Sequence, residues 1–232
     1  MQIPRTPHAW TLAPARAVAL QRRLAARVRV AAPETPLRRV AGVDCAFAEA
    51  RWRRPAPLGS DCIAAAVVWD VEAARVVEQR IARQPLRFPY VPGLLSFREL
   101  PSVLAALRAL ETPVDALLVD GHGLAHPRRF GIACHLGVLC DLPCAGVAKS
   151  VLVGAYADPG PRRGARRALR DRSERIGTAL RTRDATRPVF VSVGHRLDLP
   201  AAERLVLACG GGHRLPEPTR LADRAVAAAK RA

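Results

Sequence analysis

One short stretch of the chain, VDGHGLAHPRRFGIACHLG from Val119 to Gly137, places a single acid directly before a run of histidines and arginines. An apolar run ends on Asp120, and a loop with two histidines and two arginines follows at once. In an open α/β sheet, ligands and catalytic groups gather where a rigid strand opens into an exposed loop. Asp120 is therefore the first candidate site residue, and these residues alone predict an acidic and basic site at a strand end.

Two further carboxylates are candidates to join Asp120. Asp44 interrupts an apolar run, where a buried carboxylate without a partner is costly. Glu99 stands at the start of a predicted helix. If the strands of Asp44 and Asp120 are neighbours, their carboxylates converge, and a hard divalent cation such as Mg²⁺ relieves their repulsion while taking oxygen ligands. The plainer interpretation is that both aspartates are turn or cap residues and that Glu99 favours a helix N-terminus.

A metal site of this kind is suited to phosphodiester hydrolysis, because Mg²⁺ neutralises charge on the phosphate and makes a water nucleophilic. A lysine and a histidine beside the carboxylates can orient the phosphate or move protons. Lys149 in GVAKS and His126 in GLAHPRR are the candidates for these roles. Taken singly, a lysine such as Lys149 is more often a solvated charge, and a histidine such as His126 is more often a hydrogen-bonding loop residue.

The chain carries 37 lysines and arginines against 20 aspartates and glutamates, a net charge of +17. A cationic excess of this size repels itself unless an anionic partner is near, and nucleic acid is the usual partner. A compositional bias toward alanine, arginine, glycine and proline would produce the same excess without a binding role. We expect nucleic-acid binding, with phosphate contacts from the arginine-rich segment Pro161 to Arg183.

At 232 residues the chain is expected to form a single domain, residues 1–232. No uncharged run approaches the roughly 18 apolar residues that a membrane span needs, and the first residues lack the pattern of a signal peptide. The six cysteines show no CxxC pair and no zinc-site spacing, so we interpret them as small buried thiols. These features predict a cytoplasmic protein that does not bind a membrane.

Alternating strands and helices must position the candidate residues. An amphipathic helix is predicted from Pro14 until prolines end it at Pro33 and Pro36. After it come strands at Arg39 to Phe47, Cys62 to Trp69 and Ala74 to Ile81, a helix through Leu100 to Leu110, a strand at Val114 to Val119, a helix at Gly131 to Cys140 and a strand at Cys144 to Val147. This order is the opening of a ribonuclease-H-like α/β fold, a mixed sheet flanked by helices. The fold serves unrelated functions and does not identify the activity.

The remaining segments are less regular in sequence. The insert Arg51 to Gly59 is predicted to be a hairpin loop. The first part of the segment Pro161 to Arg183 is predicted to be poorly regular, with a strand in its tail from Arg175. A strand at Pro188 to Val193 and helices at Leu199 to Cys209 and Pro218 to Lys230 complete the chain.

Three long blocks together resemble the endonuclease V family: PYVPGLLSFRE (Pro89 to Glu99), the Asp120 stretch and GVAKS (Gly146 to Ser150). GVDCAF, GHR and RLPEPTRLAD occur with them in the family's order. GVDCAF and GHR are weak patterns alone, but the joint occurrence of the long blocks is specific. The resemblance runs from about Trp10 to Asp223.

The resemblance implies a Mg²⁺-dependent nuclease of DNA repair, with Mn²⁺ as an alternative ion. It implies cleavage of the second phosphodiester on the 3′ side of a deoxyinosine, leaving 3′-hydroxyl and 5′-phosphate ends. Asp44, Glu99 and Asp120 match the family's metal-binding acids, and Lys149 and His126 match positions assigned to catalysis or phosphate contact. The implied partner is DNA containing deoxyinosine. Inosine-containing RNA stays open as a substrate, because a 2′-hydroxyl contact depends on positions in space.

The proline-rich block also matches the family's strand-separating wedge, which is Pro89, Tyr90, Val91 and Pro92. Prolines stiffen such a loop, and the ring of Tyr90 can stack where a base has left the helix. A base that an enzyme inspects must leave the helix, and a poorly paired base leaves at least cost. The resemblance places Gly93, Leu95, Gly121 and Ile132 around the hypoxanthine pocket. The plainer interpretation of Tyr90 is a half-buried core ring.

The sequence departs from the family pattern at three positions. Cys45 follows the first acid, Cys134 stands where serine is usual, and Asp223 stands where some members have histidine. Two other functional classes stay open: a non-catalytic nucleic-acid-binding module that has kept the fold, and a related nuclease acting on branched or abasic DNA. The intact acids with Lys149 favour an enzyme over a pure binding module.

Overall fold

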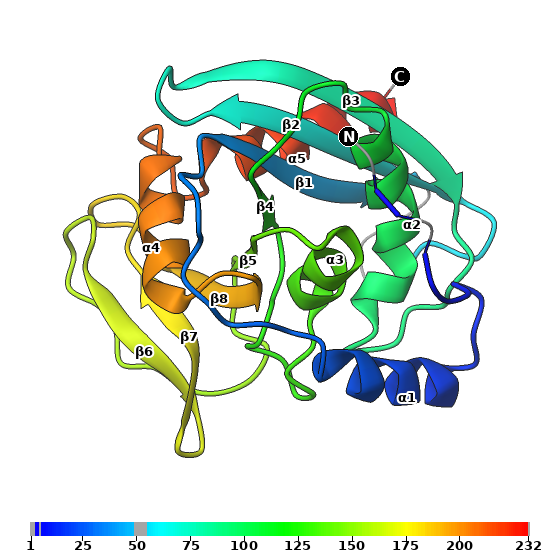
Figure 1. The fold of residues 1–232 in the computed structure, drawn as a ribbon, viewed down its shortest axis with the longest axis horizontal. Coiled ribbons are helices and arrows are strands. Elements are labelled where there is room, and N and C mark those ends of the chain that lie inside the picture. Colours follow the sequence, from blue (N-terminus) through cyan, green and yellow to red (C-terminus); the bar gives the residue numbers. More distant parts are fainter. Residues whose placement is uncertain (1–2, 5, 49–54, 232) are drawn as a thin grey trace.

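A computed structural model describes residues 3–4, 6–48 and 55–231. Eight strands form one mixed sheet in the order β3-β2-β1-β4-β5-β8-β7-β6 (Figure 1). Strand bounds are β1 Arg39–Phe47, β2 Asp61–Asp70, β3 Arg75–Pro85, β4 Ala116–Val119, β5 Cys144–Ala148, β6 Arg166–Asp171, β7 Glu174–Leu180 and β8 Val189–His195. Helix bounds are α1 Pro14–Ala25, α2 Leu95–Arg108, α3 Ile132–Cys140, α4 Leu199–Ala208 and α5 Glu217–Arg231.

The first three strands are antiparallel, and β4 and β5 then continue the sheet parallel to β1. The last three strands return antiparallel beyond β5. This arrangement confirms the ribonuclease-H-like mixed sheet. Because β1, β4 and β5 are parallel neighbours, their carboxyl ends open at one edge of the sheet, where ligands of α/β sheets bind.

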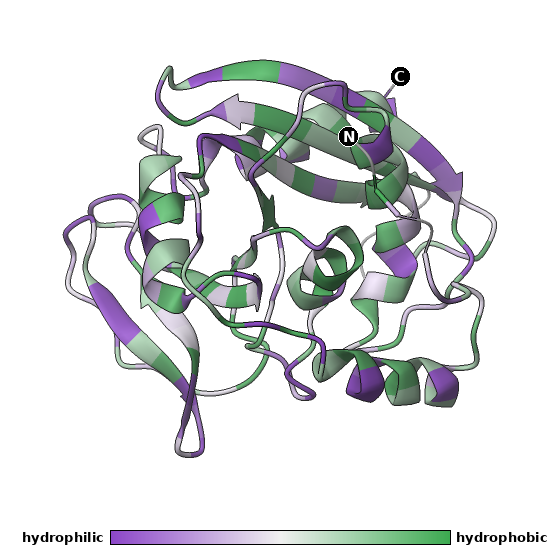
Figure 2. Ribbon diagram, viewed as in Figure 1, coloured by the Kyte–Doolittle hydropathy of each residue, from purple (hydrophilic) through white to green (hydrophobic). Residues whose placement is uncertain are grey.

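Both faces of the central strands are covered. Leu117 of β4 packs with α2 and α3 in one core cluster, whereas its neighbour Leu118 packs with α4 in another. Successive side chains of a strand point to opposite faces, which is why a doubly covered strand is an unbroken apolar run. Figure 2 shows this contrast, with hydrophobic central strands and alternating polar residues along β3. The apolar run before Asp120 therefore marks the rigid centre of the molecule.

Helix α5 lies directly against β1 and β2, behind them in Figure 1. Its alanines pack on β2, and its first turn touches the backbone of Gly42 in β1. A Cβ atom at Gly42 would lie 2.1 Å from the carbonyl carbon of Pro218, so only glycine allows this approach. The close contact brings a C-terminal helix next to the strand that carries Asp44.

Helix α2 begins earlier than the sequence predicts. It starts at Leu95, so Glu99 lies in its second turn and not at its N-terminus. Buried Leu94, Ser96 and Phe97 hold this extra turn in the core, although no side chain caps it. The alternative role of Glu99 as a helix-start residue is therefore wrong.

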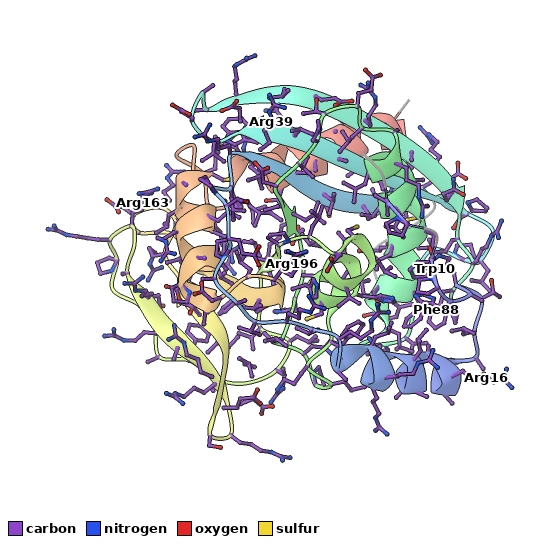
Figure 3. The ribbon with its side chains drawn as sticks, viewed as in Figure 1. Trp10, Arg16, Arg39, Phe88, Arg163 and Arg196 are labelled. Atoms are coloured by element: carbon purple, nitrogen blue, oxygen red, sulfur yellow. The ribbon has the colours of Figure 1, made fainter. Side chains whose placement is uncertain are left out.

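Helix α1 ends at Ala25, well before the prolines that were expected to end it. Its buried face is formed by Ala17, Leu20, Gln21 and Leu24, and the chain that follows, residues 26–39, is half-buried or exposed. Trp10 and Phe88 belong to the aromatic and apolar cluster beneath α1 (Figure 3). The backbone then turns, with the amide of Val28 bonded to the carbonyl of Ala25.

The basic segment is more regular than the sequence predicts. It forms the β6–β7 hairpin, with Arg166 to Asp171 as an edge strand. Leu169 and Ile176 are buried against Phe190 of β8, which anchors the hairpin despite its charge. Buried Glu203 of α4 accepts from the guanidinium groups of two of the arginines. The expectation of a poorly regular segment is wrong because these contacts do not depend on local periodicity.

The insert before β2, the cysteines and the absence of a membrane span were also expected from the sequence. Of the predicted hairpin loop Arg51 to Gly59, residues 51–54 lie outside the described residues, and the rest is irregular with a turn before β2. All six cysteines are free, and each is buried or half-buried. In the described part of the chain, no helix is long and apolar enough to cross a membrane.

Candidate functional site

Parallel strand pairing brings the predicted acids together. Val43 of β1 is in register with Val119 of β4, so Asp44 and Asp120 occupy the next position on adjacent strands. Lys149 follows β5, the next parallel strand. Its ammonium nitrogen lies 2.6 Å from Oδ2 of Asp120. The convergence predicted for these residues follows from the order of the strands.

Asp223 joins this group from α5. Its Oδ1 lies 3.6 Å from Nζ of Lys149. The sequence placed Asp223 at the end of a matching block but did not decide between a site role and a helix-surface role. The close contact of α5 with β1 is what brings it to the site. We use the term charged centre for Asp44, Glu99, Asp120, Lys149 and Asp223.

The carboxylates of the charged centre oppose one another. Burial, with the nearby charge of Asp120, raises the pKa of Asp44 to about 8. Burial also raises the pKa of Glu99 well above its ordinary value, and the charges of Cys62, Asp44 and Asp120 add to this effect. A neighbouring negative charge disfavours ionisation of a carboxyl group. The centre therefore holds more acid than its single lysine neutralises.

This donor set fits a hard divalent cation. Carboxylate oxygens are the ligands that Mg²⁺ and Mn²⁺ take, and a cation would relieve the repulsion that raises the two pKa values. Among the described residues, no three His, Cys, Asp or Glu side chains are grouped closely enough to form a ready metal site. Asp120 is paired instead with Lys149.

Lys149 is a fixed cation in this structure. Burial lowers its pKa, but the hydrogen bond to Asp120 and the charges of the acids outweigh burial and raise the pKa above its usual value. Arg214 holds the backbone here, since its Nη2 donates to the carbonyl oxygens of Lys149 at 2.5 Å and of Pro188 at 2.8 Å. Lys149 therefore acts as a positive charge and not as a base.

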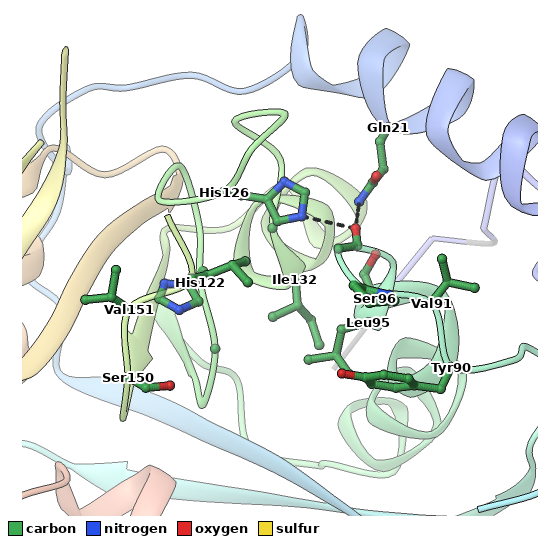
Figure 4. Close-up of a pocket in the computed structure, with 15 residues that line it drawn as sticks. Gln21, Tyr90, Val91, Leu95, Ser96, His122, His126, Ile132, Ser150 and Val151 are labelled. Carbon is green, nitrogen blue, oxygen red and sulfur yellow. Dashed lines mark hydrogen bonds between the residues drawn. The ribbon is translucent and has the colours of Figure 1, made fainter. Parts of the chain in front are cut away.

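A cavity of about 240 Å³ lies beside the charged centre. Its lining includes all four residues expected around a base: Gly93, Leu95, Gly121 and Ile132. The wedge residues Tyr90, Val91 and Pro92 also line it, and exposed Pro89 lies outside the lining. Figure 4 shows Tyr90, Leu95 and Ile132 around the cavity.

The cavity and the charged centre share a wall. Gly121 directly follows Asp120, and Ser150 directly follows Lys149, and both line the cavity. A Cβ atom at Gly121 would lie 2.6 Å from Cγ2 of Ile132, so a side chain there would close the cavity. A group bound in the cavity is therefore next to residues that directly follow Asp120 and Lys149, the two residues that form the ion pair.

The ring of Tyr90 is 57% exposed. It stands on a loop held by prolines between β3 and α2. The alternative interpretation of Tyr90 as a half-buried core ring is wrong. An exposed aromatic ring on a stiff loop beside a cavity is available for stacking on a base.

His126 lines the cavity and is hydrogen-bonded at both ring nitrogens. Nε2 lies 3.1 Å from the carbonyl oxygen of Gly93, and Nδ1 accepts from the amide of Arg128 at 3.2 Å. Burial, with the charge of Arg128, lowers the pKa of His126 to about 4. Among the described residues, His126 makes no hydrogen bond or ion pair with the charged centre. Its neutral ring therefore links Gly93 to the backbone of Arg128 at the cavity wall.

Several residues of the cavity were not found from the sequence. They are Gln21, Ser96, His122, Gly131, Ser150, Val151 and Leu152. Burial lowers the pKa of His122 to about 4, and its Nδ1 is buried without a partner in the described structure. The only sequence signal for most of these residues was their place inside or beside the matching blocks. Gln21 gave a different signal, a polar residue on the apolar face of α1.

Comparisons with known proteins show which family the chain belongs to. A family model described as Endonuclease V matches residues 22–224. The chain is 49% identical over 221 residues to the Endonuclease V of Roseiflexus castenholzii, covering 95% of each chain. The crystal structure of the Endonuclease V from Streptomyces avermitilis is 45% identical, with a TM-score of 0.87 over 97% of this chain and 96% of that one.

A more distant structure shares the fold. The Endonuclease V of Ciona intestinalis, solved in complex with a DNA containing an inosine followed by a ribo-adenosine, is 23% identical, with a TM-score of 0.77 over 94% of this chain and 97% of that one. The family match and the first relative span nearly the whole of this chain. The chain therefore belongs to the endonuclease V family and is an endonuclease.

Proposed function

We propose that this endonuclease recognises deoxyinosine in DNA and hydrolyses the second phosphodiester on its 3′ side, leaving 3′-hydroxyl and 5′-phosphate ends. The observation that supports this most directly is the wall shared by the cavity and the charged centre. A base held in the cavity keeps its own strand beside Asp120 and Lys149. Recognition of one nucleotide and cleavage a short distance away then follow from one binding event.

Asp44, Glu99 and Asp120 are the residues that would hold the Mg²⁺ ion, with Mn²⁺ as the alternative. When bound, the ion neutralises charge on the phosphate and makes a water nucleophilic at neutral pH. Lys149 stays protonated beside Asp120 and offers a positive charge to the same phosphate. His126, which the resemblance assigns to catalysis or phosphate contact, is proposed to act as a positioning residue that holds the cavity wall as a neutral ring.

The cavity is proposed to hold the extruded base. Hypoxanthine carries an oxygen and a ring N–H where adenine carries an amino group and a bare acceptor, and fixed polar groups distinguish the two patterns. Glycine at positions 93 and 121 lets the backbone come close to a ligand. The exposed ring of Tyr90 is proposed to fill the space that the base leaves in the duplex.

The partner is proposed to be inosine-containing DNA in a repair role, acted on by a single-domain, cytoplasmic protein. The Ciona relative was solved with a DNA that contains both an inosine and a ribonucleotide. Inosine-containing RNA therefore remains the second candidate substrate, and a substrate panel separates the two.

The β6–β7 hairpin is proposed to bind phosphates. Asp171 and Glu174, its two acids, are both paired with Arg129 of the loop that follows β4. Exposed Arg167 and Arg172 are left without an acidic partner among the described residues. Arginines without an acidic partner can contact phosphates, and such contacts give affinity that does not depend on base sequence.

The experiment that tests the proposed function is strand cleavage of a duplex carrying one deoxyinosine. Wild type is compared with Asp120→Ala, each with Mg²⁺, with Mn²⁺ and with a chelator. We expect a metal-dependent nick one nucleotide beyond the inosine, absent from the unmodified duplex and lost in Asp120→Ala. A nick at a different position, or equal cutting of both duplexes, contradicts the proposal.

A further inference from the structure

The backbone carbonyl of Gly93 is the meeting point of three hydrogen-bond donors. It accepts from Gln21 Nε2 at 3.0 Å, from His126 Nε2 at 3.1 Å and from Arg128 Nη2 at 2.7 Å. Figure 4 shows Gln21 and His126 reaching the same oxygen. A carbonyl oxygen has two lone pairs, so three donors leave it no capacity to turn toward a ligand.

Gln21 uses all of its polar atoms in this cluster. Its amide nitrogen also donates to the carbonyl oxygen of Phe130 at 3.2 Å, and its Oε1 accepts from Nε of Arg128 at 2.7 Å. The side chain is 1% exposed. Gln21 thereby ties α1 to the wedge loop at Gly93 and to the loop before α3 at Phe130.

A polar residue on this helix face needs an explanation. The other buried residues of α1 are Ala17, Leu20 and Leu24, which pack in an apolar and aromatic cluster. Apolar packing alone would be served by another leucine, whereas a buried amide must find partners for each of its polar atoms. The partners that Gln21 finds are Gly93, Arg128 and Phe130, and we use the term cavity frame for these residues with Gln21 and His126.

Gly93 is the position where movement would matter most. Its φ of +77° is a left-handed conformation, and it stands between the wedge and the first turn of α2, where Leu95 lines the cavity. If this peptide rotated, Tyr90 and Leu95 would shift relative to Gly121 and Ile132 on the opposite wall. Recognition of one base over another depends on polar groups held within about half an ångström of their places.

We propose that Gln21 is a positioning residue for base recognition. Together with Arg128 it fixes the Gly93 carbonyl and so sets the distance between the wedge loop and the opposite wall of the cavity. Helix α1 in this way contributes to base recognition, although the polar side-chain atoms of Gln21 form hydrogen bonds only within the protein. The inference rests on the proposed function, because the cavity it concerns is the proposed base pocket.

The test is the ratio of affinities for an inosine duplex and the matching unmodified duplex, measured by fluorescence anisotropy in chelator so that no strand is cut. Gln21→Met keeps the length of the side chain and removes its hydrogen bonds. We expect the ratio to fall about tenfold, the effect of losing roughly 1.4 kcal/mol of discrimination. In cleavage with Mg²⁺ over a range of DNA concentrations, we expect kcat to change less than KM.

Leu24→Ala is the matched control. Leu24 is 4% exposed on the same face of the same helix and has no hydrogen bond to the cavity frame through its side chain. Its truncation leaves a cavity that destabilises the protein but should leave the affinity ratio unchanged. If Leu24→Ala lowers the ratio as much as Gln21→Met does, Gln21 contributes stability alone and the proposal is overturned.

Arg128→Met provides a second test that does not depend on the folding of Gln21→Met. Arg128 reaches the same carbonyl and the same glutamine, so its loss should lower the ratio too, and the two substitutions should not add. Additive effects overturn the shared role. A Gln21→Met protein that discriminates like wild type overturns only this inference. A wild-type protein with equal affinity for both duplexes overturns the proposed function and this inference with it.

Discussion

The charged centre and the cavity share a wall but are built in opposite ways. In the charged centre, burial and mutual repulsion raise the pKa values of Asp44 and Glu99, and one lysine faces several acids. In the cavity wall, Gln21 and His126 have partners for all of their polar side-chain atoms. The first region stores electrostatic strain that a cation can relieve, and the second is organised before any ligand arrives.

This difference suits two different tasks. Chemistry at a phosphate needs positive charge whose interaction strengthens as negative charge develops on the phosphate, which the lysine would offer directly and the carboxylates would supply by holding a cation. Recognition of a base needs groups that do not move, which a saturated hydrogen-bond cluster provides. The comparison predicts that substitutions in the charged centre lower activity but raise stability. Substitutions in the cavity frame are expected to lower both activity and stability.

The largest effect is expected for Asp44→Asn. Activity should fall at least about a hundredfold, as when one preorganised electrostatic group is removed. Stability should rise, because folding raises the pKa of Asp44 from 3.8 to about 8, so the wild type loses stability as pH increases through this window. In chelator at pH 8, we expect a gain on the order of 3 kcal/mol.

Urea denaturation of wild type and Asp44→Asn at pH 5 and pH 8, with and without Mg²⁺, measures this effect. The gain should be larger at pH 8 than at pH 5. Mg²⁺ should stabilise the wild type and have little effect on the variant. An Asp44→Asn protein that is no more stable than wild type at pH 8 in chelator would break the comparison.

The cavity frame should respond to pH in the opposite sense. His126 has a folded-state pKa of about 4 against 6.5 when free, so the unfolded chain binds its proton first as pH falls. The stability contributed by the neutral ring is complete above pH 6.5 and is lost between pH 6.5 and pH 4, on the order of 3 kcal/mol. We expect His126→Gln to flatten the dependence of the unfolding free energy on pH in this window. Identical slopes for variant and wild type would contradict the neutral, hydrogen-bonded ring.

A smaller effect is expected for Gly93→Ala. The left-handed backbone costs about 1 kcal/mol with a side chain, and the new Cβ would lie 2.7 Å from Nη2 of Arg128. Cleavage at inosine, measured as kcat/KM, should fall about tenfold. Gly59→Ala is the matched control, because Gly59 has φ of +89° and nothing within 4 Å of a new Cβ. Equal losses in both variants would show that backbone strain, and not the cavity frame, is responsible.

The smallest effect is expected on the hairpin, which belongs to neither region. Arg167→Ala should weaken binding of inosine and unmodified duplexes equally, about two- to threefold, and should lower the slope of log affinity against log salt by about 1. Arg75→Ala on β3, at the opposite edge of the sheet, is the control and should leave affinity unchanged. Anisotropy titrations between about 50 and 200 mM salt measure both. A selective loss of inosine binding in Arg167→Ala would place the hairpin within the recognition site.

The sequence predicted most of the fold, because central strands and amphipathic helices carry their periodicity locally. The bounds of β1 match the predicted strand, and α3 and β5 differ from theirs by one residue. The β6 strand was missed, because its arginines obscure the single buried position, Leu169, that fixes it. Pairing with β7 and the buried Glu203 are tertiary contacts that no local pattern contains.

The candidate site was predictable where it lies within contiguous blocks. The order of the strands predicted that Asp44 and Asp120 meet, and the matching blocks predicted the glycines of the cavity. Gln21 was not found, since its partner at Gly93 is 72 residues away in sequence. Asp223 was left undecided, because its place depends on how closely α5 approaches β1.

The seating of α5 against β1 and β2 has a consequence for the time at which the enzyme matures. Helix α5 follows all eight strands in the sequence, and chains are made from the N-terminus at roughly 5 to 20 residues per second. Until this helix emerges, one apolar face of β2 is uncovered, and Asp223 cannot lie beside Lys149. A nascent chain therefore lacks the acid that α5 contributes beside Lys149 until this helix has emerged and packed on the sheet.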